Sequence, residues 1–264
     1  MRYLNICLVI LLANSCQGKS ATEQQAEIAE EPIESVEVSQ VPRVTTMPDF
    51  TQYADVREKK QAFFDFLRPM VEEENARILA ERSRIITIYD SYAATQTFTP
   101  EDTTWLIAIA KQMKIKNFDI ANANQRSALL TKKDIIPASL FLAQAANESG
   151  WGTSRFAREA NNLFGQWCFT PGCGIVPSKR IPGEYHEIKK FETVNDAVNS
   201  YVRNINRHHA YRELRALREE MRNRGEVPTG EQLAAGLKRY SQRGEEYVKE
   251  IQSMIRVNKL DIAE

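Results

Sequence analysis

The stretch from Pro137 to Gly165 constrains the fold more than any other part of the sequence, because it joins an almost wholly apolar helix to one acid. Residues 135–146 leave almost no polar face, which predicts a buried helix rather than a surface helix. Pro137 suits the first helical turn, and Ser149-Gly150 should end the helix, since glycine readily adopts the left-handed conformation that closes one. Glu148 therefore falls in the last turn of a buried helix.

Glu148 is the residue on which a functional hypothesis can be based. Apolar surroundings and the negative end of the helix dipole should both raise its pKa, so that the carboxyl group stays protonated near neutral pH. Gln144 lies one turn earlier on the same face, within reach to hydrogen-bond and orient the acid. The alternative is an ordinary cap or ion pair at a helix end, since glutamate is almost never fully buried unless it is paired.

Aromatic and amide side chains follow Glu148 closely, and they are Trp151, Asn161, Asn162, Phe164 and Trp167. Aromatic faces stack on pyranose rings and amides bind hydroxyl and N-acetyl groups, so such a set beside a buried acid is typical of sites that cleave sugars. Phe164 and either tryptophan could equally be core residues, because buried aromatics are common in any fold.

The run AQAANESGWGTSRFAREANNLFG, residues 143–165, resembles the signature of the glucosaminidase family of peptidoglycan hydrolases, which have a mannosyl-glycoprotein endo-beta-N-acetylglucosaminidase-like domain. The segments WCFTPGCG (167–174), HEIKKF (186–191) and RYSQRGEEYV (239–248) resemble the Bax-like subgroup of Gram-negative bacteria. The resemblance covers about residues 135–258. It implies a mostly α, lysozyme-like, two-lobed α+β catalytic domain with a small β-hairpin.

The same resemblance implies a glycoside hydrolase that cleaves the bond after N-acetylglucosamine in peptidoglycan, with Glu148 as general acid. It implies that Tyr240 faces the acid and steadies the N-acetyl group or a water, although helix packing would also explain this tyrosine. Two other functions stay open: a lytic transglycosylase with a lone glutamate, and a peptidoglycan-binding or regulatory module that does not cut. Peptidoglycan is the expected partner, and no cofactor or protein partner is predicted.

A second carboxylate often lies on the β lobe in this family, where it activates water or supports the transition state. Strand alternation over residues 184–191 puts Glu187 on one face with Tyr185 and Phe191, and Glu184 on the other face. Glu187 is therefore the predicted second catalytic acid. The alternative is that Glu184 and Glu187 are both solvated charges at a strand edge.

Cys168 and Cys173 are separated by a Phe-Thr-Pro-Gly turn that can bring the two thiols together. In an exported protein these cysteines are expected to form a disulfide. A metal site is the alternative, but no histidine stands at zinc spacing to the cysteines, and no metal is predicted.

Residues 1–16 have the layout of a secretory signal, with an early positive charge and an apolar run before Cys16. The ending Ala-Asn-Ser-Cys resembles the lipobox of bacterial lipoproteins, which predicts a lipid on Cys16; signal cleavage without lipid is the alternative. Residues 17–48 contain no aromatic residue and are predicted to be a disordered acidic linker. The expected location is the periplasm, with the protein anchored to the outer membrane.

Residues 49–133 are predicted to form a helical region that packs against, or regulates access to, a glucosaminidase-like domain over residues 134–264. Helical spacing extends over residues 50–94, and Pro69 should end or kink that helix near Leu67 or Arg68. The heptads are not sustained, which disfavours a coiled coil. Short strands are expected at 174–176 and 185–191, with helices from Val194 onward.

The 35 basic and 35 acidic residues cancel, so the net charge gives no reason to expect nucleic acid as a partner. The charge-rich segment 212–224 is predicted to be a solvated helix face with ion pairs between residues four apart.

Overall fold

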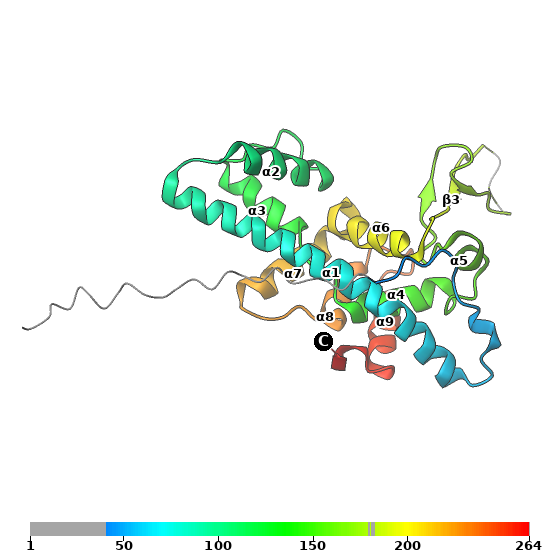
Figure 1. Cartoon of the computed structure of the whole chain (residues 1–264). Coiled ribbons are helices and arrows are strands. Elements are labelled where there is room, and N and C mark those ends of the chain that lie inside the picture. The colour runs from blue at the N-terminus through cyan, green and yellow to red at the C-terminus, as the bar shows by residue number, and fades with distance from the viewer. Residues whose placement is uncertain (1–40, 179, 181–182, 264) are drawn as a thin grey trace, which may run out of the picture. The chain divides into compact units, whose positions relative to one another are not determined.

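The computed structural model is mostly helical, as the spacing of apolar residues predicts (Figure 1). It describes residues 41–178, 180 and 183–263. The helices are η1 (Phe50–Gln52), α1 (Val56–Thr95), α2 (Pro100–Gln112), α3 (Ala123–Lys132), α4 (Ala138–Ser149), α5 (Arg155–Ala160), α6 (Val194–Arg207), η2 (His209–Tyr211), α7 (Arg212–Asn223), α8 (Gly230–Ala234), η3 (Ala235–Leu237), α9 (Glu245–Val257) and η4 (Leu260–Ala263), where η marks a 3₁₀ helix. The strands are β1 (Trp167–Cys168), β2 (Gly174–Ile175) and β3 (Glu187–Lys189). The predicted fold class, mostly α with a small β element after a helical region, is confirmed.

Helix α1 is continuous over 40 residues and runs through Pro69, so the helix does not end near Leu67 or Arg68, and a kink there stays a prediction. Proline removes one backbone hydrogen bond from a helix. Leu67, Met70 and Val71 beside it are buried, and burial of their apolar side chains offsets that loss. Within the described residues, no helix combines the length and the apolar character needed to cross a membrane.

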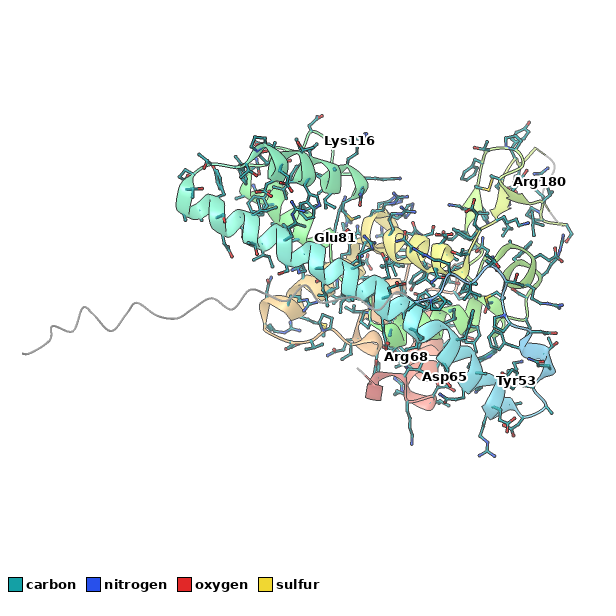
Figure 2. All side chains as sticks on the ribbon, viewed as in Figure 1. Tyr53, Asp65, Arg68, Glu81, Lys116 and Arg180 are labelled. Carbon is teal, nitrogen blue, oxygen red and sulfur yellow. A yellow bond between two sulfur atoms is a disulfide. The ribbon has the colours of Figure 1, made fainter. Side chains whose placement is uncertain are left out.

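Two hydrophobic clusters organise the helices. The larger one surrounds α4 and includes buried residues of α1, α6, α8 and α9. The smaller one lies where α2 and α3 pack beside the C-terminal half of α1, and its members include Ile85, Tyr89, Leu106, Ile109 and Leu129 (Figure 1). Glu81, part-way along α1, forms an ion pair with the buried Lys133 that follows α3 (Figure 2).

Residues 41–48 differ from the prediction of a linker that reaches Pro48. The backbone N–H of Val44 donates to the Asn195 side chain at 3.1 Å, and the Val44 carbonyl accepts from the Val194 N–H at 2.8 Å. Met47 is buried in the larger core. These residues are held because hydrogen bonds tie Val44 to the start of α6 and Met47 is buried in the core. The remainder of the predicted linker lies outside the described residues.

Helix α7 corrects a second expectation, because part of its charged sequence is buried rather than solvated. Arg215 donates to the carbonyls of Ile205 and His208 at the end of α6. Arg218 is 1% exposed. It donates to the carbonyls of Thr131, Asp134 and Ile135 between α3 and α4. Arg215 and Arg218 thus satisfy carbonyls at the C-terminal ends of α6 and α3, and Arg218 also satisfies carbonyls of the loop before α4.

The small sheet is antiparallel with strand order β1-β3-β2, and β3 pairs Ile188 with Trp167 on one side and with Ile175 on the other. Strand β1 was not predicted. Gly174 is required for the pairing of β2, since a Cβ atom there would lie 1.9 Å from the Ile188 carbonyl oxygen.

Candidate active site

Helix α4 places Glu148 at the edge of the larger core. The helix ends where the sequence predicts, because Gly150 takes a left-handed conformation with φ of 57° and its N–H bonds the Ala146 carbonyl. The Ser149 hydroxyl secures the turn, since it donates to the Ala145 carbonyl and accepts from the Gly152 N–H. Glu148 is half-buried in the last turn, with its carboxyl group beside α9.

Burial is the main influence on the Glu148 carboxyl and raises its pKa above the ordinary value of a glutamate. Hydrogen bonds from Tyr247 and Asn147 and the charge of Arg243 oppose that rise, and Glu250 adds to it. The predicted direction of the shift is confirmed. The carboxyl group therefore keeps its proton to a higher pH than an exposed glutamate does, as a general acid requires.

A chain of side-chain hydrogen bonds leads from the core to Glu148. The Tyr201 hydroxyl donates to Gln144 Oε1 at 2.5 Å, and Gln144 Nε2 donates to the Tyr247 hydroxyl at 2.9 Å. The Tyr247 hydroxyl donates to Glu148 Oε1 at 2.8 Å. Gln144 is fully buried and reaches the acid through Tyr247 rather than directly.

The tyrosine that contacts the acid is Tyr247, which the sequence analysis missed. Its position could have been found, because Tyr247, Ile251 and Ile255 recur every four residues on the buried face of α9. Tyr240 stacks on the Tyr247 ring with centroids 5.1 Å apart. Burial raises the pKa of both tyrosines, so both stay neutral at working pH. The catalytic role of Tyr240 stays a prediction.

Asn161 and Asn162 both bond backbone groups. Asn161 Nδ2 donates to the carbonyls of Thr45 and Phe191 at 2.9 and 3.1 Å. Asn162 Nδ2 donates to the carbonyl of Lys189, and its Oδ1 accepts the Gln166 N–H. These bonds hold the part of the chain that contains β1, β2 and β3, here called the β lobe, against α5. Direct contact of either amide with substrate stays a prediction.

The aromatic candidates divide into packed and exposed residues. Trp151 is half-buried and meets Phe63 and Phe64 of α1 edge to face. Phe164 is buried and stacks on Tyr201, with centroids 4.1 Å apart. Trp167 is 56% exposed and stacks on His186. Phe169 and Tyr185 of the same lobe, which the sequence analysis did not single out as substrate contacts, are 71% and 79% exposed. Trp167 is thus the candidate with an open face.

The β lobe is braced by a disulfide between Cys168 and Cys173, as the sequence predicts. The Glu187 carboxylate accepts the backbone N–H groups of Gly172 and Gly174 at 3.0 and 2.8 Å, and these bonds hold its pKa below the ordinary value. The expectation that Glu187 shares a face with Tyr185 is wrong, because β3 begins at Glu187 and the exposed Tyr185 precedes it. The catalytic role of Glu187 stays a prediction.

The sulfur atoms of Cys168 and Cys173 and a carboxylate oxygen of Glu187 lie within 4.8 Å of one another. This proximity does not make a metal site, because the two sulfurs are bonded to each other and Glu187 accepts two backbone N–H groups. The three side chains instead close one turn around residues 168–174.

We expect Glu187→Ala to loosen that turn, because two charge-assisted hydrogen bonds to its backbone are lost. The amide hydrogens of Gly172 and Gly174 should exchange with solvent roughly tenfold faster, as measured by NMR. Glu184→Ala is the matched control, since among the described residues its carboxylate pairs with the ring of His186 and not with the backbone of the turn. Unchanged exchange in Glu187→Ala would remove the structural role and leave the catalytic one.

Comparison with known proteins assigns the chain to a family. A model described as Mannosyl-glycoprotein endo-beta-N-acetylglucosaminidase, of the glucosaminidase family, matches residues 123–260, more than half of the sequence. The chain therefore belongs to the glucosaminidase family, as its motifs predict. The match begins at α3, which the sequence analysis placed in the preceding helical region.

A particular relative supports the same assignment. The chain is similar to Protein bax of Escherichia coli (strain K12), with 33% identity over 219 residues that cover 83% of this chain and 77% of that protein. No solved structure matches the chain.

Proposed function

We propose that this protein is a peptidoglycan hydrolase that cleaves the glycosidic bond after N-acetylglucosamine, with Glu148 as general acid. The single observation that carries the proposal is the half-buried carboxyl group of Glu148, whose pKa is raised by burial and which one hydrogen bond from Tyr247 orients. The membership of the glucosaminidase family supports a glycosidic bond as the target.

In the proposed reaction the Glu148 carboxyl group donates its proton to the glycosidic oxygen as the bond from that oxygen to C1 of the sugar breaks. Positive charge develops on the sugar ring, and a water molecule adds to C1 and gives up a proton, which restores the acid form of Glu148. The exposed face of Trp167 is the proposed platform for a pyranose ring, because an open indole ring offers an apolar surface to a sugar.

A lytic transglycosylase is the second candidate, and one observation favours it. The predicted second acid, Glu187, is tied to backbone N–H groups, which is compatible with Glu148 acting as a lone acid. Such an enzyme would use an internal sugar hydroxyl instead of water and leave anhydro-muramic ends.

Mass spectrometry of purified peptidoglycan digested with the full-length protein tests both candidates. Borohydride reduction before analysis converts each new reducing sugar to its alcohol and thereby identifies it. Reduced N-acetylglucosamine ends support the hydrolase, and anhydro-muramic ends support the transglycosylase. Release of no fragments, with retention of the protein on sedimented peptidoglycan, would leave a binding module instead.

We also propose that the protein is exported and anchored through a lipid on Cys16, which lies outside the described residues. The signal-like layout of residues 1–16 supports this. Cys16→Ala should move the protein from the detergent-extracted membrane fraction to the soluble periplasmic fraction, as measured by immunoblot. If the variant stayed in the membrane fraction, the lipid anchor would be wrong.

A further inference from the structure

We propose that Gln144 and Tyr201 are positioning residues that fix the direction of the hydrogen-bond chain to Glu148, and so decide which carboxyl oxygen carries the acidic proton. This inference rests on the proposed role of Glu148 as general acid. The chain consists of Tyr201, Gln144, Tyr247 and Glu148, and its donor and acceptor atoms lie 2.5 to 2.9 Å apart.

Tyr201 sets the direction of these hydrogen bonds. Its ring is buried between Phe141 and Phe164, and within the described part of the chain its hydroxyl finds Gln144 as acceptor. If the Gln144 amide were reversed, its NH₂ group would face Tyr201, and the tyrosine proton would be left without an acceptor in an apolar environment. An unpaired buried donor is costly, so Tyr201 holds Oε1 of Gln144 toward itself.

The fixed amide then sets the role of Tyr247. Gln144 Nε2 can only donate, so the Tyr247 oxygen accepts from it at 2.9 Å. The hydroxyl proton of Tyr247 is therefore free to point the other way, toward Glu148 Oε1 at 2.8 Å. In the reverse direction, Glu148 would give its own proton to Tyr247, and that proton would face the core instead of the substrate.

The consequence for Glu148 follows from the chemistry of a neutral carboxylic acid, which has one carbonyl oxygen and one hydroxyl oxygen. Oε1 accepts the Tyr247 proton and so takes the carbonyl role. The acidic proton then resides on Oε2, the oxygen that does not accept from Tyr247, while the Asn147 side chain supplies a second hydrogen bond to the carboxyl group. Gln144 and Tyr201 touch neither oxygen, and they act only through Tyr247.

Loss of the fixed direction should change the titration of Glu148 in a defined sense. Tyr247 as a donor stabilises the ionised carboxylate and opposes the rise in pKa that burial causes. Without that donor the pKa rises further, so the basic limb of the activity profile moves to higher pH. The charged groups that act on the acid are Arg243 and Glu250, while Tyr211, with a pKa raised to about 12 by burial, and Tyr240 stay neutral.

The test uses Tyr201→Phe and Gln144→Met in the full chain. We measure cleavage of peptidoglycan as a function of pH, and we titrate the Glu148 side-chain carboxyl by carbon NMR. Both variants should lower the maximum rate about five- to tenfold, the size expected for one lost hydrogen bond. Both should also move the basic limb and the NMR titration of Glu148 to higher pH.

The matched control is Tyr89→Phe, which removes from the smaller cluster a buried hydroxyl that has no hydrogen-bond partner among the described residues. It should leave the rate and the titration unchanged. A uniform loss of rate in Tyr201→Phe, with an unshifted Glu148 titration, would overturn the proposal and leave Tyr201 a packing residue. If Gln144→Met fails to fold, Tyr201→Phe decides the question, because it removes one oxygen atom and keeps the ring.

The two proposals fail in distinguishable ways. If the wild-type protein releases no peptidoglycan fragments, the proposed function is wrong. The NMR titration of Glu148 in wild type and Tyr201→Phe still tests the hydrogen-bond chain in that case, because it requires no turnover.

Discussion

Replacing Glu148 with glutamine should lower the rate of peptidoglycan cleavage by about 10²- to 10⁴-fold, the range that general acid catalysis supplies. Glu148→Gln keeps the size of the side chain, and the amide oxygen can still accept the Tyr247 hydroxyl in place of Oε1. The variant cannot donate a proton to a leaving oxygen at any pH. The rate is measured as fragments released from purified peptidoglycan and separated by liquid chromatography.

Glu246→Gln is the matched control, because Glu246 is exposed in the first turn of α9, the helix that carries Tyr247. It should keep the wild-type rate. Thermal unfolding should show that Glu148→Gln is folded, since a neutral amide is easier to bury than an acid whose charged form is disfavoured there. Turnover near the wild-type rate in Glu148→Gln would show that the catalytic acid is another residue.

The position of Glu148 could be predicted because its causes are local in sequence. An apolar run makes a buried helix and a glycine ends it. The acid in the last turn of that helix therefore lies at the edge of the apolar core. The disulfide could be predicted for the same reason, because its two cysteines are five positions apart and a turn joins them. Features of this kind need no knowledge of the rest of the fold.

The partners of Glu148 could not be predicted in the same way, because they come from distant segments. Tyr247 is 99 positions away and Tyr201 is 57 positions from Gln144. Periodicity shows that Tyr247 faces the core, but it does not show which core residue it meets. The shared face of Tyr185 and Glu187 was predicted wrongly for a related reason, since strand alternation was applied to Tyr185, which precedes the strand.

The asparagines after α5 illustrate how one residue type supports two interpretations. Amides suit sugar hydroxyls, but they also suit backbone groups that a turn leaves unpaired. In the structure Asn161 takes a left-handed conformation with φ of 53° at the end of α5, and both amides bond carbonyls across the β lobe. The sequence offers no means to choose between these uses, because the carbonyls are 27 and 30 positions away.

Arg218→Met should lower the free energy of unfolding by about 3–5 kcal/mol, the usual cost of removing one partner from a buried ionic contact. Arg218 is 1% exposed, and it donates to the carbonyls of Thr131, Asp134 and Ile135. Methionine fills much of the space but leaves those carbonyls without that donor. These residues precede α4, so the loss also loosens the start of the helix that carries Glu148. Urea unfolding followed by circular dichroism measures the change.

The pH dependence of that loss separates charge from hydrogen bonding. Burial opposes ionisation of Asp134, but the Arg222 hydrogen bond and the charges of Arg218 and Arg82 hold its pKa below the ordinary 3.8. A carboxyl group whose pKa is lowered by folding stabilises the folded state at pH values above its unfolded-state pKa. That stability is lost as the pH falls through the folded-state pKa. The difference in the free energy of unfolding between wild type and Arg218→Met should therefore become smaller below pH 3.8. Arg224→Met is the control and should change stability little, because the ion pairs of Arg224 with Glu220 and Glu226 are exposed. If the difference between wild type and Arg218→Met stays constant with pH, Arg218 acts through its hydrogen bonds to the carbonyls alone.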